Sequence, residues 1–592
     1  MNSWPRVQSY FLRGTQKRLS ERQFLILLSA LVGLAAGIAA IALKTTVHYI
    51  HDVITSDYNL PFQYYLYVIF PLLGILLSVF YVQRFHKGVL EKSTAFVLYS
   101  ISKKSSLLAP FHMVAHVITS ALTIGFGGSS GLEAPIATTG SAIGSNFART
   151  FHLDYKQRTL LLSSGAAAGI AAAFNAPIAG VLFAIEVLLV DMSASAFIPL
   201  IVASAMGALC SNVLLHEGIL LTFSAQQSFN FWNIPYYIVL AILAGLLSVY
   251  YSRTFIRIDN WFDGIKGSYS KAVLAGGFLA FLIFLFPPLF GEGYNSIISL
   301  SQGNTEMLFS QSILKNFIEN EWIILLFIAA IALTKVLATS ITLSSGGNGG
   351  NFAPSLVNGA FLGFLFSRFI NLTGFTKLPE SNFTLVAMAG VMSGVMHAPL
   401  TAIFLIAEIT GGYGLMIPLM IVASISFTVV KLLEPDSIDS KKLAKKGELI
   451  IHDRDKKILS ALSLSNILET NFHSVRENAR LRELISVIEK SKRNIFPVVT
   501  EEGSLAGIIQ LDSIREIIFN QELYDKLVVK ELMQKPPLVI DVEDSMETVM
   551  KKFDETGAWN LPVVSKGKYT GFISKSSIFS KYRNQLIERS VH

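Results

Sequence analysis

Long apolar segments alternate with short polar ones along this chain as far as Pro435. A helix needs roughly 20 apolar residues to cross a bilayer, and seven segments approach or reach that length. Several are short or are interrupted by Gly and Pro, so helices that cross only part of the membrane are also expected. The pattern predicts an all-α membrane domain with many crossings. The candidate spans are 24–43, 66–82, 197–215, 234–249, 272–290, 322–337 and 415–430.

After Pro435 the pattern changes: charged residues become frequent, and helical periodicity alternates with short β-rich segments. One motif occurs twice in this part of the chain. Residues 494–499 (Asn-Ile-Phe-Pro-Val-Val) match 559–564 (Trp-Asn-Leu-Pro-Val-Val), with the two prolines 65 positions apart (562 − 497). Each copy has the order helix, strand, strand, helix, which predicts two compact α/β modules packed against each other.

These patterns predict five consecutive parts: an N-terminal cytoplasmic segment (1–22), the membrane domain (23–434), a linker (435–456) and the two modules (457–525 and 526–592). Basic residues cluster before the first span and after the last, and such residues favour the cytoplasmic side. We therefore expect both termini in the cytoplasm and a multi-pass protein of the plasma (inner) membrane. The residues concerned are Arg6, Arg13, Lys17, Arg18 and Arg22, then Lys431, Lys441, Lys442, Lys445 and Lys446.

Composition supports the membrane interpretation, because 52% of the 592 residues are hydrophobic and only 15% are charged. The formal net charge of +7 reflects the basic residues that flank the membrane, and no basic patch interleaved with aromatic residues indicates nucleic-acid binding. Cys210 is the only cysteine, which excludes disulfides within the chain and metal sites built from cysteines. No nucleophile–base set, phosphate-binding loop or metal-ligand spacing emerges, so we expect neither an enzyme nor a metal site.

The membrane domain contains a weak internal repeat. Residues 175–186 (Asn-Ala-Pro-Ile-Ala-Gly-Val-Leu-Phe-Ala-Ile-Glu) resemble 397–408 (His-Ala-Pro-Leu-Thr-Ala-Ile-Phe-Leu-Ile-Ala-Glu), with the first prolines 222 positions apart (399 − 177). A second pair of segments, 131–135 and 349–354, has its prolines 219 positions apart (354 − 135). Such similar offsets indicate a duplicated half, and duplicated halves of membrane proteins are often inverted with the ligand between them. The sequence by itself does not show the inversion.

The second pair, Gly-Leu-Glu-Ala-Pro (131–135) and Gly-Gly-Asn-Phe-Ala-Pro (349–354), predicts two helix starts at membrane depth. Glycine lets the backbone approach a ligand closely, and proline is tolerated in the first turn of a helix. The exposed N–H groups and the positive dipole end of a helix attract an anion. The pair therefore predicts an anion site between the two segments. Its expected donors are Gly131, Leu132, Ala134, Gly350, Asn351, Phe352 and Ala353.

These motifs, with 175–186, 398–408 and the segment 335–339 that leads into 344–354, resemble the CLC family of chloride channels and proton-coupled chloride exchangers. The C-terminal repeat resembles a pair of CBS modules. The resemblance implies a CLC-like membrane domain of inverted repeats in membrane lipid, followed by a cytoplasmic tandem CBS domain. It also implies a homodimer with a separate anion pathway in each subunit. Chloride is the anion that the resemblance implies, with fluoride and nitrate as alternatives.

Glu133 occupies the position of the family's gating glutamate. A carboxylate at a helix start competes with the permeant anion for the same N–H groups, and a proton that binds Glu133 would remove that competitor. The alternative is a glutamate in the first turn that only complements the helix dipole. An ionisable group at membrane depth is more often functional, so we favour the gate. Phe352 has a second interpretation as a packing residue, which is compatible with anion binding by its backbone N–H.

The first anion-binding loop departs from the family's pattern. The family usually has Gly-Ser-Gly-Ile-Pro there, whereas the corresponding residues here are 91–95 (Glu-Lys-Ser-Thr-Ala). Ser93 would then supply the hydroxyl that holds an anion, and Lys92 would attract anions, although a full charge in a pore can bind them too tightly for fast flow. In the alternative, this segment bends away and Lys92 reaches water.

Two further departures concern the inner half of the pathway. The family's inner tyrosine has no equivalent, because the candidate positions hold Ser437, Ile438 and Asp439, which predicts a more open inner end. In the family's exchangers, a glutamate that relays protons follows the residue equivalent to Glu186. Here that position is Val187, whose side chain carries no proton. We therefore favour a passive channel, with a chloride/proton exchanger as the alternative because some exchangers lack this glutamate.

Other polar residues of the membrane domain have structural interpretations. Glu186 and Glu408 occupy equivalent positions in the repeat, so we expect both to accept hydrogen bonds in their halves rather than to carry protons. Lys335 lies in an apolar segment and is expected to be paired or to extend to water. His397 is equivalent to Asn175, which favours packing or helix capping over metal binding.

The resemblance to CBS modules implies a possible adenine-nucleotide site between them, in which an Asp holds the ribose. The first module keeps Asp512 but has Gln510 in place of Thr or Ser, and the second keeps Ser574 but lacks the Asp. A composite nucleotide site would use Asp512 and Ser574, but we favour Asp512 as the N-cap of the following helix. No other cofactor is expected. A membrane protein whose tail senses a ligand is a third functional hypothesis, and the intact helix-start motifs argue against it.

Overall fold

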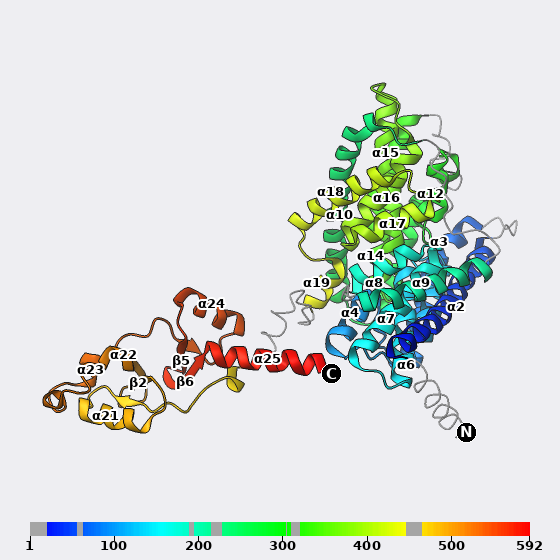
Figure 1. The fold of residues 1–592 in the computed structure, drawn as a ribbon. Helices are drawn as coiled ribbons and strands as arrows, with labels where there is room; N and C mark the ends of the chain where they lie inside the picture. Colours follow the sequence, from blue (N-terminus) through cyan, green and yellow to red (C-terminus); the bar gives the residue numbers. More distant parts are fainter. Residues whose placement is uncertain are drawn as a thin grey trace, which may run out of the picture. The chain divides into compact units, whose positions relative to one another are not determined.

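The computed structural model describes residues 20–55, 63–188, 194–214, 228–303, 305–309, 320–445 and 464–591. The chain divides into two compact units, residues 1–450 and 451–592 (Figure 1). Some predictions fall outside the described residues. These are most of the segment 1–22 with Arg6, Arg13, Lys17 and Arg18, the second half of the linker 435–456 with Lys446, and the beginning of the first module.

The first unit is helical, and its helices differ widely in length (Figure 1). Those of the first half are α2 (Glu21–Thr55), α3 (Gln63–Phe85), α4 (Ser93–Lys103), α5 (His112–Gly125), α6 (Glu133–Thr150), α7 (Tyr155–Phe174), α8 (Pro177–Leu188) and α9 (Ala194–Leu214). Those of the second half are α10 (Ile234–Asp263), α11 (Ser268–Leu285), α12 (Tyr294–Ser301), α13 (Glu306–Phe309), α14 (Glu321–Ser344), α15 (Phe352–Thr373), α16 (Glu380–Met396), α17 (Pro399–Ile409), α18 (Met416–Leu433) and α19 (Ile438–Lys445). Short 3₁₀ turns, η1 (Phe231–Asn233) and η2 (Pro287–Leu289), precede α10 and follow α11.

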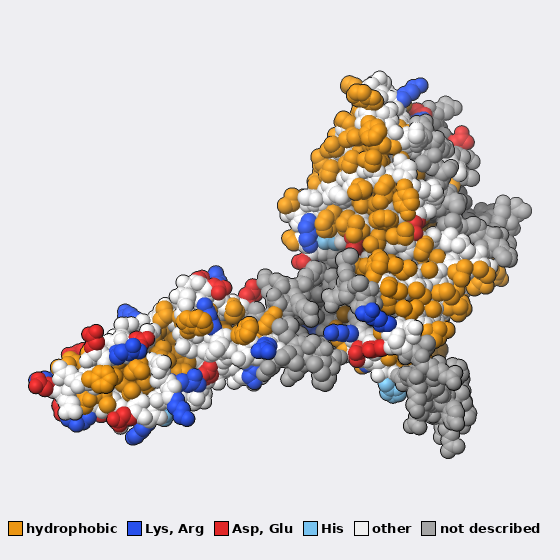
Figure 2. Space-filling view, in the orientation of Figure 1, with side chains coloured by type: hydrophobic (Ala, Val, Ile, Leu, Met, Phe, Trp, Pro, Cys, Tyr) orange, Lys and Arg blue, Asp and Glu red, His pale blue; other side chains and the backbone are white. Residues whose placement is uncertain are grey.

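Among the described residues, eight helical segments are long and apolar enough to cross a membrane. All seven spans predicted from hydropathy fall on one of these segments, which confirms them. The eighth is α15, which the sequence pattern missed because Ser355, Asn358 and Gly359 interrupt its apolar residues. Figure 2 shows hydrophobic side chains covering much of the visible face of this unit, and Leu326, for example, is 72% exposed. Such a surface is suited to contact with lipid acyl chains.

Equivalent helices of the two halves pack through equivalent glycines. On α6, a Cβ added to Gly140 or Gly144 would lie 2.1 or 2.0 Å from a backbone oxygen of α7. On α15, a Cβ added to Gly359 or Gly363 would lie 2.5 or 2.2 Å from a backbone oxygen of α16. Both glycines recur at an offset of 219 (359 − 140 and 363 − 144). Small residues let membrane helices approach closely. The duplication inferred from sequence is therefore also seen in the structure, since α6 packs on α7 as α15 packs on α16.

The two halves are inverted relative to each other at their contact. Glu186 lies near the end of α8 and accepts hydrogen bonds from the start of α17, while Glu408 near the end of α17 accepts hydrogen bonds from the start of α8. The two equivalent helices therefore run antiparallel. This confirms both glutamates as hydrogen-bond acceptors, although each accepts from the opposite half and not from its own half as expected. The four backbone donors are Leu400, Thr401, Ile178 and Ala179, at N···O distances of 2.9, 2.7, 3.0 and 2.9 Å.

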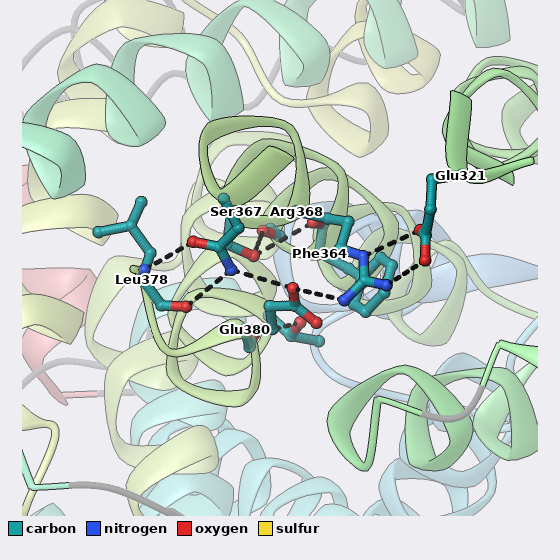
Figure 3. A network of polar contacts seen from close by, with 9 residues as sticks. Glu321, Phe364, Ser367, Arg368, Leu378 and Glu380 are labelled. Atoms are coloured by element: carbon teal, nitrogen blue, oxygen red, sulfur yellow. Dashed lines mark hydrogen bonds and ion pairs between the residues drawn. The ribbon is translucent and has the colours of Figure 1, made fainter. Parts of the chain in front are cut away.

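Two further polar features organise the helix ends. Asn175 ends α7 and His397 ends α16, both with left-handed backbone angles (φ of 53° and 55°), which confirms the predicted role of this pair in helix capping. Arg368, near the end of α15, lies between Glu321 at the start of α14 and Glu380 at the start of α16 (Figure 3). Its guanidinium is 2.6 Å from Glu321 and 3.2 Å from Glu380, so it connects three helices at one end of α15.

Within residues 464–591, the second unit contains two three-stranded sheets with the orders β1-β2-β3 and β4-β5-β6. In each sheet the first pair of strands is parallel and the second is antiparallel, which confirms two similar α/β modules. The first module has β1 (Val475–Arg476), α21 (Leu481–Lys490), β2 (Ile495–Val499), β3 (Leu505–Gln510), α22 (Leu511–Ile514) and α23 (Val529–Leu532). The second has β4 (Ile540–Asp541), α24 (Met546–Thr556), β5 (Asn560–Ser565), β6 (Lys568–Ser574) and α25 (Lys575–Val591).

A short segment, residues 464–469, connects the two modules because it contacts the second one. Leu464 and Ile467 belong to the predicted first module (457–525) but lie in the apolar core of the second. Glu469 pairs with Phe572 on β6. Burial of these apolar side chains therefore attaches residues 464–469 to the second module, although the sequence prediction placed them in the first.

Candidate functional site

Two helix starts from opposite halves of the membrane unit lie side by side at the predicted anion site. Gly131 and Gly350 exchange backbone hydrogen bonds as an antiparallel pair, with N···O distances of 3.0 and 2.8 Å. Helix α6 begins at Glu133 and α15 begins at Phe352, each two residues after its glycine. The pairing brings the positive ends of both helices together, and such ends attract anions.

The side chain of Glu133 crosses from one helix start to the other. It is the first residue of α6 and is 2% exposed. Its Oε2 accepts a hydrogen bond from the backbone N–H of Ala353, 3.4 Å away in the first turn of α15. Its Oε1 accepts a short hydrogen bond from the hydroxyl of Tyr294. The carboxylate therefore lies at the N-terminus of α15, which is the position that an anion would need.

Glycine is required for this close approach. A Cβ added to Gly131 would lie 2.1 Å from Oε2 of Glu133 and 2.8 Å from the Cβ of Ala353. A Cβ added to Gly350 would lie 2.7 Å from the Cβ of Ala134. Contacts shorter than van der Waals distance force neighbouring atoms apart. The two glycines therefore allow both helix starts and the carboxylate to occupy one small volume.

Besides Ala353, whose N–H donates to Glu133, three more of the predicted anion donors have partners within the protein. Gly131 and Gly350 donate to each other, and the N–H of Leu132 donates to Oε1 of Glu292 at 3.2 Å. These three groups do not face an anion in this conformation, contrary to the simplest expectation from the motif. The physical reason is that the two loops pair with each other as strands do, and that Glu292 reaches the site from a distant segment.

The other predicted donors differ in their surroundings. Phe352 is 2% exposed and its ring stacks on Phe174 with 5.4 Å between centroids, which confirms its packing role. The side-chain oxygen of Asn351 accepts a hydrogen bond from the Tyr251 hydroxyl at 3.2 Å. Ala134 is buried beneath Gly350. Anion binding by the backbone N–H groups of these residues stays a prediction.

Glu292 and Tyr294 belong to the site but were missed in the sequence. Glu292 lies in the turn that leads into α12, between Gly291 and Gly293 with φ of 63° and 94°, and Tyr294 is the first residue of α12. Lys335 is fully buried, and its ammonium donates to the carbonyl oxygen of Gly291 at 3.1 Å. The expected pairing of Lys335 is thereby confirmed, and it holds this turn in place. The sequence feature that could have indicated Glu292 is a glutamate between two glycines within an apolar segment.

Lys92 and Ser93 also have partners within the protein. The ammonium of Lys92 donates to the carbonyl oxygens of Gly346 and Gly347, the latter at 3.1 Å. The hydroxyl of Ser93 donates to Oδ1 of Asp439 at 2.7 Å. In this conformation Lys92 therefore holds the loop before α15, and the polar groups of both residues are bonded within the protein. The alternative, in which Lys92 reaches water, is not what the ammonium does, since it bonds the loop carbonyls, although Lys92 is only half-buried.

Asp439, one of the residues predicted at the inner end of the pathway, contacts the first loop. Asp439, in α19, accepts hydrogen bonds from the hydroxyls of Ser93 and Thr94 at the start of α4. A carboxylate thus contacts the loop that was predicted to supply an anion-binding hydroxyl. Val187, at the predicted proton-relay position, is partly buried against the core of the unit. Its neighbour Glu186 is engaged in capping α17.

The two residues proposed for nucleotide binding differ in exposure. The side chain of Asp512 is 80% exposed and forms an ion pair with Arg515. Asp512 is the second residue of α22, whose N-cap is Gln510, so the favoured interpretation of Asp512 as an N-cap is wrong. Ser574 is buried, and its hydroxyl donates to Glu469 at 2.7 Å. A composite adenine-nucleotide site stays a prediction.

An apolar helical unit made of inverted repeats, with a carboxylate at paired helix starts inside it, defines a membrane protein for anion transport. The family model described as voltage gated chloride channel matches residues 74–431, and the CBS domain model matches 464–520 and 529–584. The chain therefore belongs to the voltage-gated chloride channel (CLC) family, whose members are transporters and channels, and carries two CBS domains.

Relatives of known sequence agree with this assignment. "Chloride channel protein CLC-f" from Arabidopsis thaliana is 26% identical over 95% of this chain and 81% of its own length. "Voltage-gated ClC-type chloride channel ClcB" from Escherichia coli O81 (strain ED1a) is 29% identical over 55% of this chain and 75% of its own length. The first of these relatives thus matches both the membrane unit and the C-terminal unit.

Solved structures share the fold. The crystal structure of a slow cyanobacterial Cl⁻/H⁺ antiporter has a TM-score of 0.62 at 21% identity, covering 72% of this chain and 98% of that one. The crystal structure of a eukaryotic CLC transporter has a TM-score of 0.62 at 19% identity, covering 93% and 97%. At these identities the likeness establishes a common fold, and the transport mechanism requires its own argument.

Proposed function

We propose that this protein is a homodimeric chloride channel with one anion pathway in each subunit, gated by Glu133. The observation that carries the proposal is the carboxylate of Glu133 at the N-terminus of α15, 3.4 Å from the N–H of Ala353. A helix N-terminus stabilises one negative group at a time in a volume this small. Anion and carboxylate therefore exclude each other, and the pathway is closed while Glu133 is ionised and in place.

Opening follows from neutralising or displacing this carboxylate. A proton that binds Glu133 removes its negative charge, so its attraction to the start of α15 weakens and a chloride ion can take its position. The hydroxyl of Tyr294 donates to the same carboxylate. A hydrogen bond donated to an ionised oxygen stabilises the ionised form, so Tyr294 favours the closed pathway.

The passive channel is favoured over an exchanger by the inner half of the unit. Val187 has no ionisable group, and Glu186 accepts hydrogen bonds from two backbone N–H groups and the Thr401 hydroxyl. Neither residue is suited to pass protons from the cytoplasmic side to Glu133. A chloride/proton antiporter is the second candidate, supported by the structural likeness to a slow cyanobacterial Cl⁻/H⁺ antiporter. The proposed orientation, with both termini in the cytoplasm of the plasma (inner) membrane, rests on the flanking basic residues.

Flux measurements on the full chain in liposomes test this proposal. Chloride flux and internal pH would be recorded together for the wild type, for Glu133→Gln and for the control Glu321→Gln, which removes a carboxylate at the opposite end of α15. We expect chloride flux without uphill proton movement, and a large increase in flux only in Glu133→Gln. Uphill proton pumping that is lost in Glu133→Gln would establish the exchanger instead. Unchanged flux in Glu133→Gln would exclude the gate.

A further inference from the structure

A second carboxylate lies at the same helix start as the proposed gate. Oε1 of Glu292 accepts a hydrogen bond from the N–H of Leu132 at 3.2 Å, and Leu132 is the N-cap residue that precedes Glu133. Glu133 covers the start of α15, and Glu292 covers the start of α6. Both helix starts that were predicted to bind the anion are therefore covered by carboxylates, one from each of two distant segments.

Glu292 is accessible from a cavity, which distinguishes it from the deeply buried Glu133. The cavity has a volume of about 580 Å³ and is lined by His48, His51 and Asp52 of α2 and by Glu292 and Tyr294. Glu292 is partly exposed there. Tyr294 both lines the cavity and donates to Glu133. An anion that enters from this cavity therefore meets Glu292 before it reaches Glu133.

The position of the cavity indicates which side of the membrane it faces. It lies at the end of α2 that is opposite Glu21. A helix of 35 residues is roughly 50 Å long at about 1.5 Å per residue, so its two ends lie on opposite sides of a membrane. With the N-terminus in the cytoplasm, as proposed above, the cavity faces the outside.

Charges of both signs surround Glu292. Lys44 and Lys335 attract its carboxylate and Glu133 repels it. Two ionised carboxylates at adjoining helix starts repel each other, and the two ammonium groups offset that repulsion. The titratable or charged groups that face Glu292 are Lys44, His48, His51 and Asp52 on α2, Glu133 on α6, Tyr294 on α12 and Lys335 on α14.

We propose that Glu292 is a second, outer gate of the anion pathway, controlled by protons from the cavity. In its ionised form it occupies the Leu132 N–H and repels an incoming anion. When a proton from the cavity binds its carboxylate, the negative charge is removed and the Leu132 N–H becomes available to the anion. The proton returns to the cavity when Glu292 ionises again, so the cycle consumes nothing. This inference rests on the proposed function and adds a second proton-binding step to it.

Two proton-binding gates predict a recognisable dependence of flux on external pH. One protonation changes the open fraction at most about tenfold per pH unit, and two can change it up to about a hundredfold. We expect the wild-type flux to rise more steeply than the limit for one site as the external pH falls. Glu133→Gln and Glu292→Gln should each retain a dependence no steeper than that limit, and the double variant should vary less than about twofold over the same range.

The decisive comparison is between Glu133→Gln and the double variant Glu133→Gln/Glu292→Gln, reconstituted as full chains in chloride-loaded liposomes. Loss of the remaining pH dependence in the double variant supports the outer gate. His48→Gln/His51→Gln and Asp52→Asn in the Glu133→Gln background are matched controls, which should keep that dependence. Loss of the dependence in one of these controls, with its persistence in the double variant, would overturn the proposal.

A purely structural role of Glu292 gives different results. If Glu292 only caps α6, Glu133→Gln alone removes all pH dependence and Glu292→Gln lowers stability without changing the pH profile, which overturns the proposal. Glu292→Asp keeps the charge on a shorter side chain, so it should keep a pH-dependent flux even if Glu292→Gln does not fold. A flat pH profile of Glu292→Asp in the Glu133→Gln background would contradict the outer gate. Absence of chloride flux in the wild type would contradict the proposed function itself.

Discussion

The two halves of the membrane unit use glutamate in two contrasting ways. At α8 and α17 both halves carry a glutamate, Glu186 and Glu408, 222 positions apart (408 − 186), and each caps the helix of the other half. At α6 and α15 only one half does, because the residue 219 positions after Glu133 is Phe352 (352 − 133). The geometry of the two contacts is similar, since in each a carboxylate reaches the helix start of the opposite half.

The two contacts differ in whether the N–H groups at the helix starts have permanent partners. Where the glutamate is duplicated, both helix starts have permanent partners and the contact holds the halves together. Where it occurs once, one carboxylate lies on a helix start that an anion can also bind. The other helix start, at Leu132, is covered by Glu292 from outside the repeated motifs. In this unit a symmetric pair of carboxylates thus serves structure, and the broken symmetry provides a site for gating.

The largest expected effect on stability comes from the symmetric pair. Glu186→Ala or Glu408→Ala leaves two backbone N–H groups at a helix start without their acceptor, and we expect each to lower the free energy of unfolding by about 2–4 kcal/mol. Thermal unfolding of the detergent-solubilised full chain measures this loss. Glu321→Gln, which removes a partly exposed ion pair, should cost less than about 1 kcal/mol. A loss of stability in only one of the two variants would show that Glu186 and Glu408 do not have equivalent structural roles.

Glu133→Gln should show the opposite pattern, a small effect on stability and a large one on flux. The oxygen of glutamine can accept the hydrogen bond from the Ala353 N–H, and its amide group can donate to the Tyr294 hydroxyl. The free energy of unfolding should therefore change by less than about 1 kcal/mol. At a pH one unit above the pKa of the gating carboxyl group, that group is protonated in only about a tenth of the molecules. Glutamine is neutral at every pH. Chloride flux should therefore rise about tenfold or more, as measured by efflux from liposomes. A loss of stability as large as that of Glu408→Ala would assign Glu133 to structure instead.

A smaller effect is expected at the inner end. Asp439→Asn removes a negative charge that contacts the Ser93 hydroxyl at 2.7 Å while keeping an acceptor for it. Anions should then enter from the cytoplasmic side more readily, by about 2- to 5-fold at low salt and less at high salt. Flux at two ionic strengths measures this change. Asp263→Asn, in an exposed pair with Lys445, is the matched control, and an equal response of both variants would show that general surface charge is responsible.

The smallest effect concerns the second CBS module. Burial acts to raise the pKa of Asp544, but hydrogen bonds from the Lys552 ammonium (2.6 Å) and the Asp541 N–H (2.9 Å) lower it overall. A lowered pKa in the folded state contributes stability at pH values above the ordinary pKa of Asp, about 3.8, and this contribution is lost as the pH falls through the folded-state pKa. Hydrogen exchange of the β4–β6 amides in the full chain should show a loss below about 1 kcal/mol. Asp544→Asn should not show it.

Several particular residues show how far the sequence leads. The helix starts at Glu133 and Phe352, the duplication and the capping role of His397 follow from local motifs and their spacing, because glycine, proline and hydropathy act within a few residues. The partners of Lys92, Ser93 and Leu132 do not follow. Each of these residues meets a group from a segment far along the chain, such as Gly347, Asp439 and Glu292, and no local pattern specifies that encounter.

The sequence by itself determined that this protein crosses a membrane many times, that its membrane unit is a duplicated half and that two CBS modules follow. These properties are carried by hydropathy, by repeat offsets and by motif chemistry, all of which are linear. Only the tertiary structure decided which carboxylate covers which helix start. The contact of Leu132 with Glu292 joins residues 160 positions apart, and that of Glu133 with Ala353 joins residues 220 positions apart. Such contacts depend on how the inverted halves pack, because helix packing sets the distance between groups that the chain itself keeps far apart.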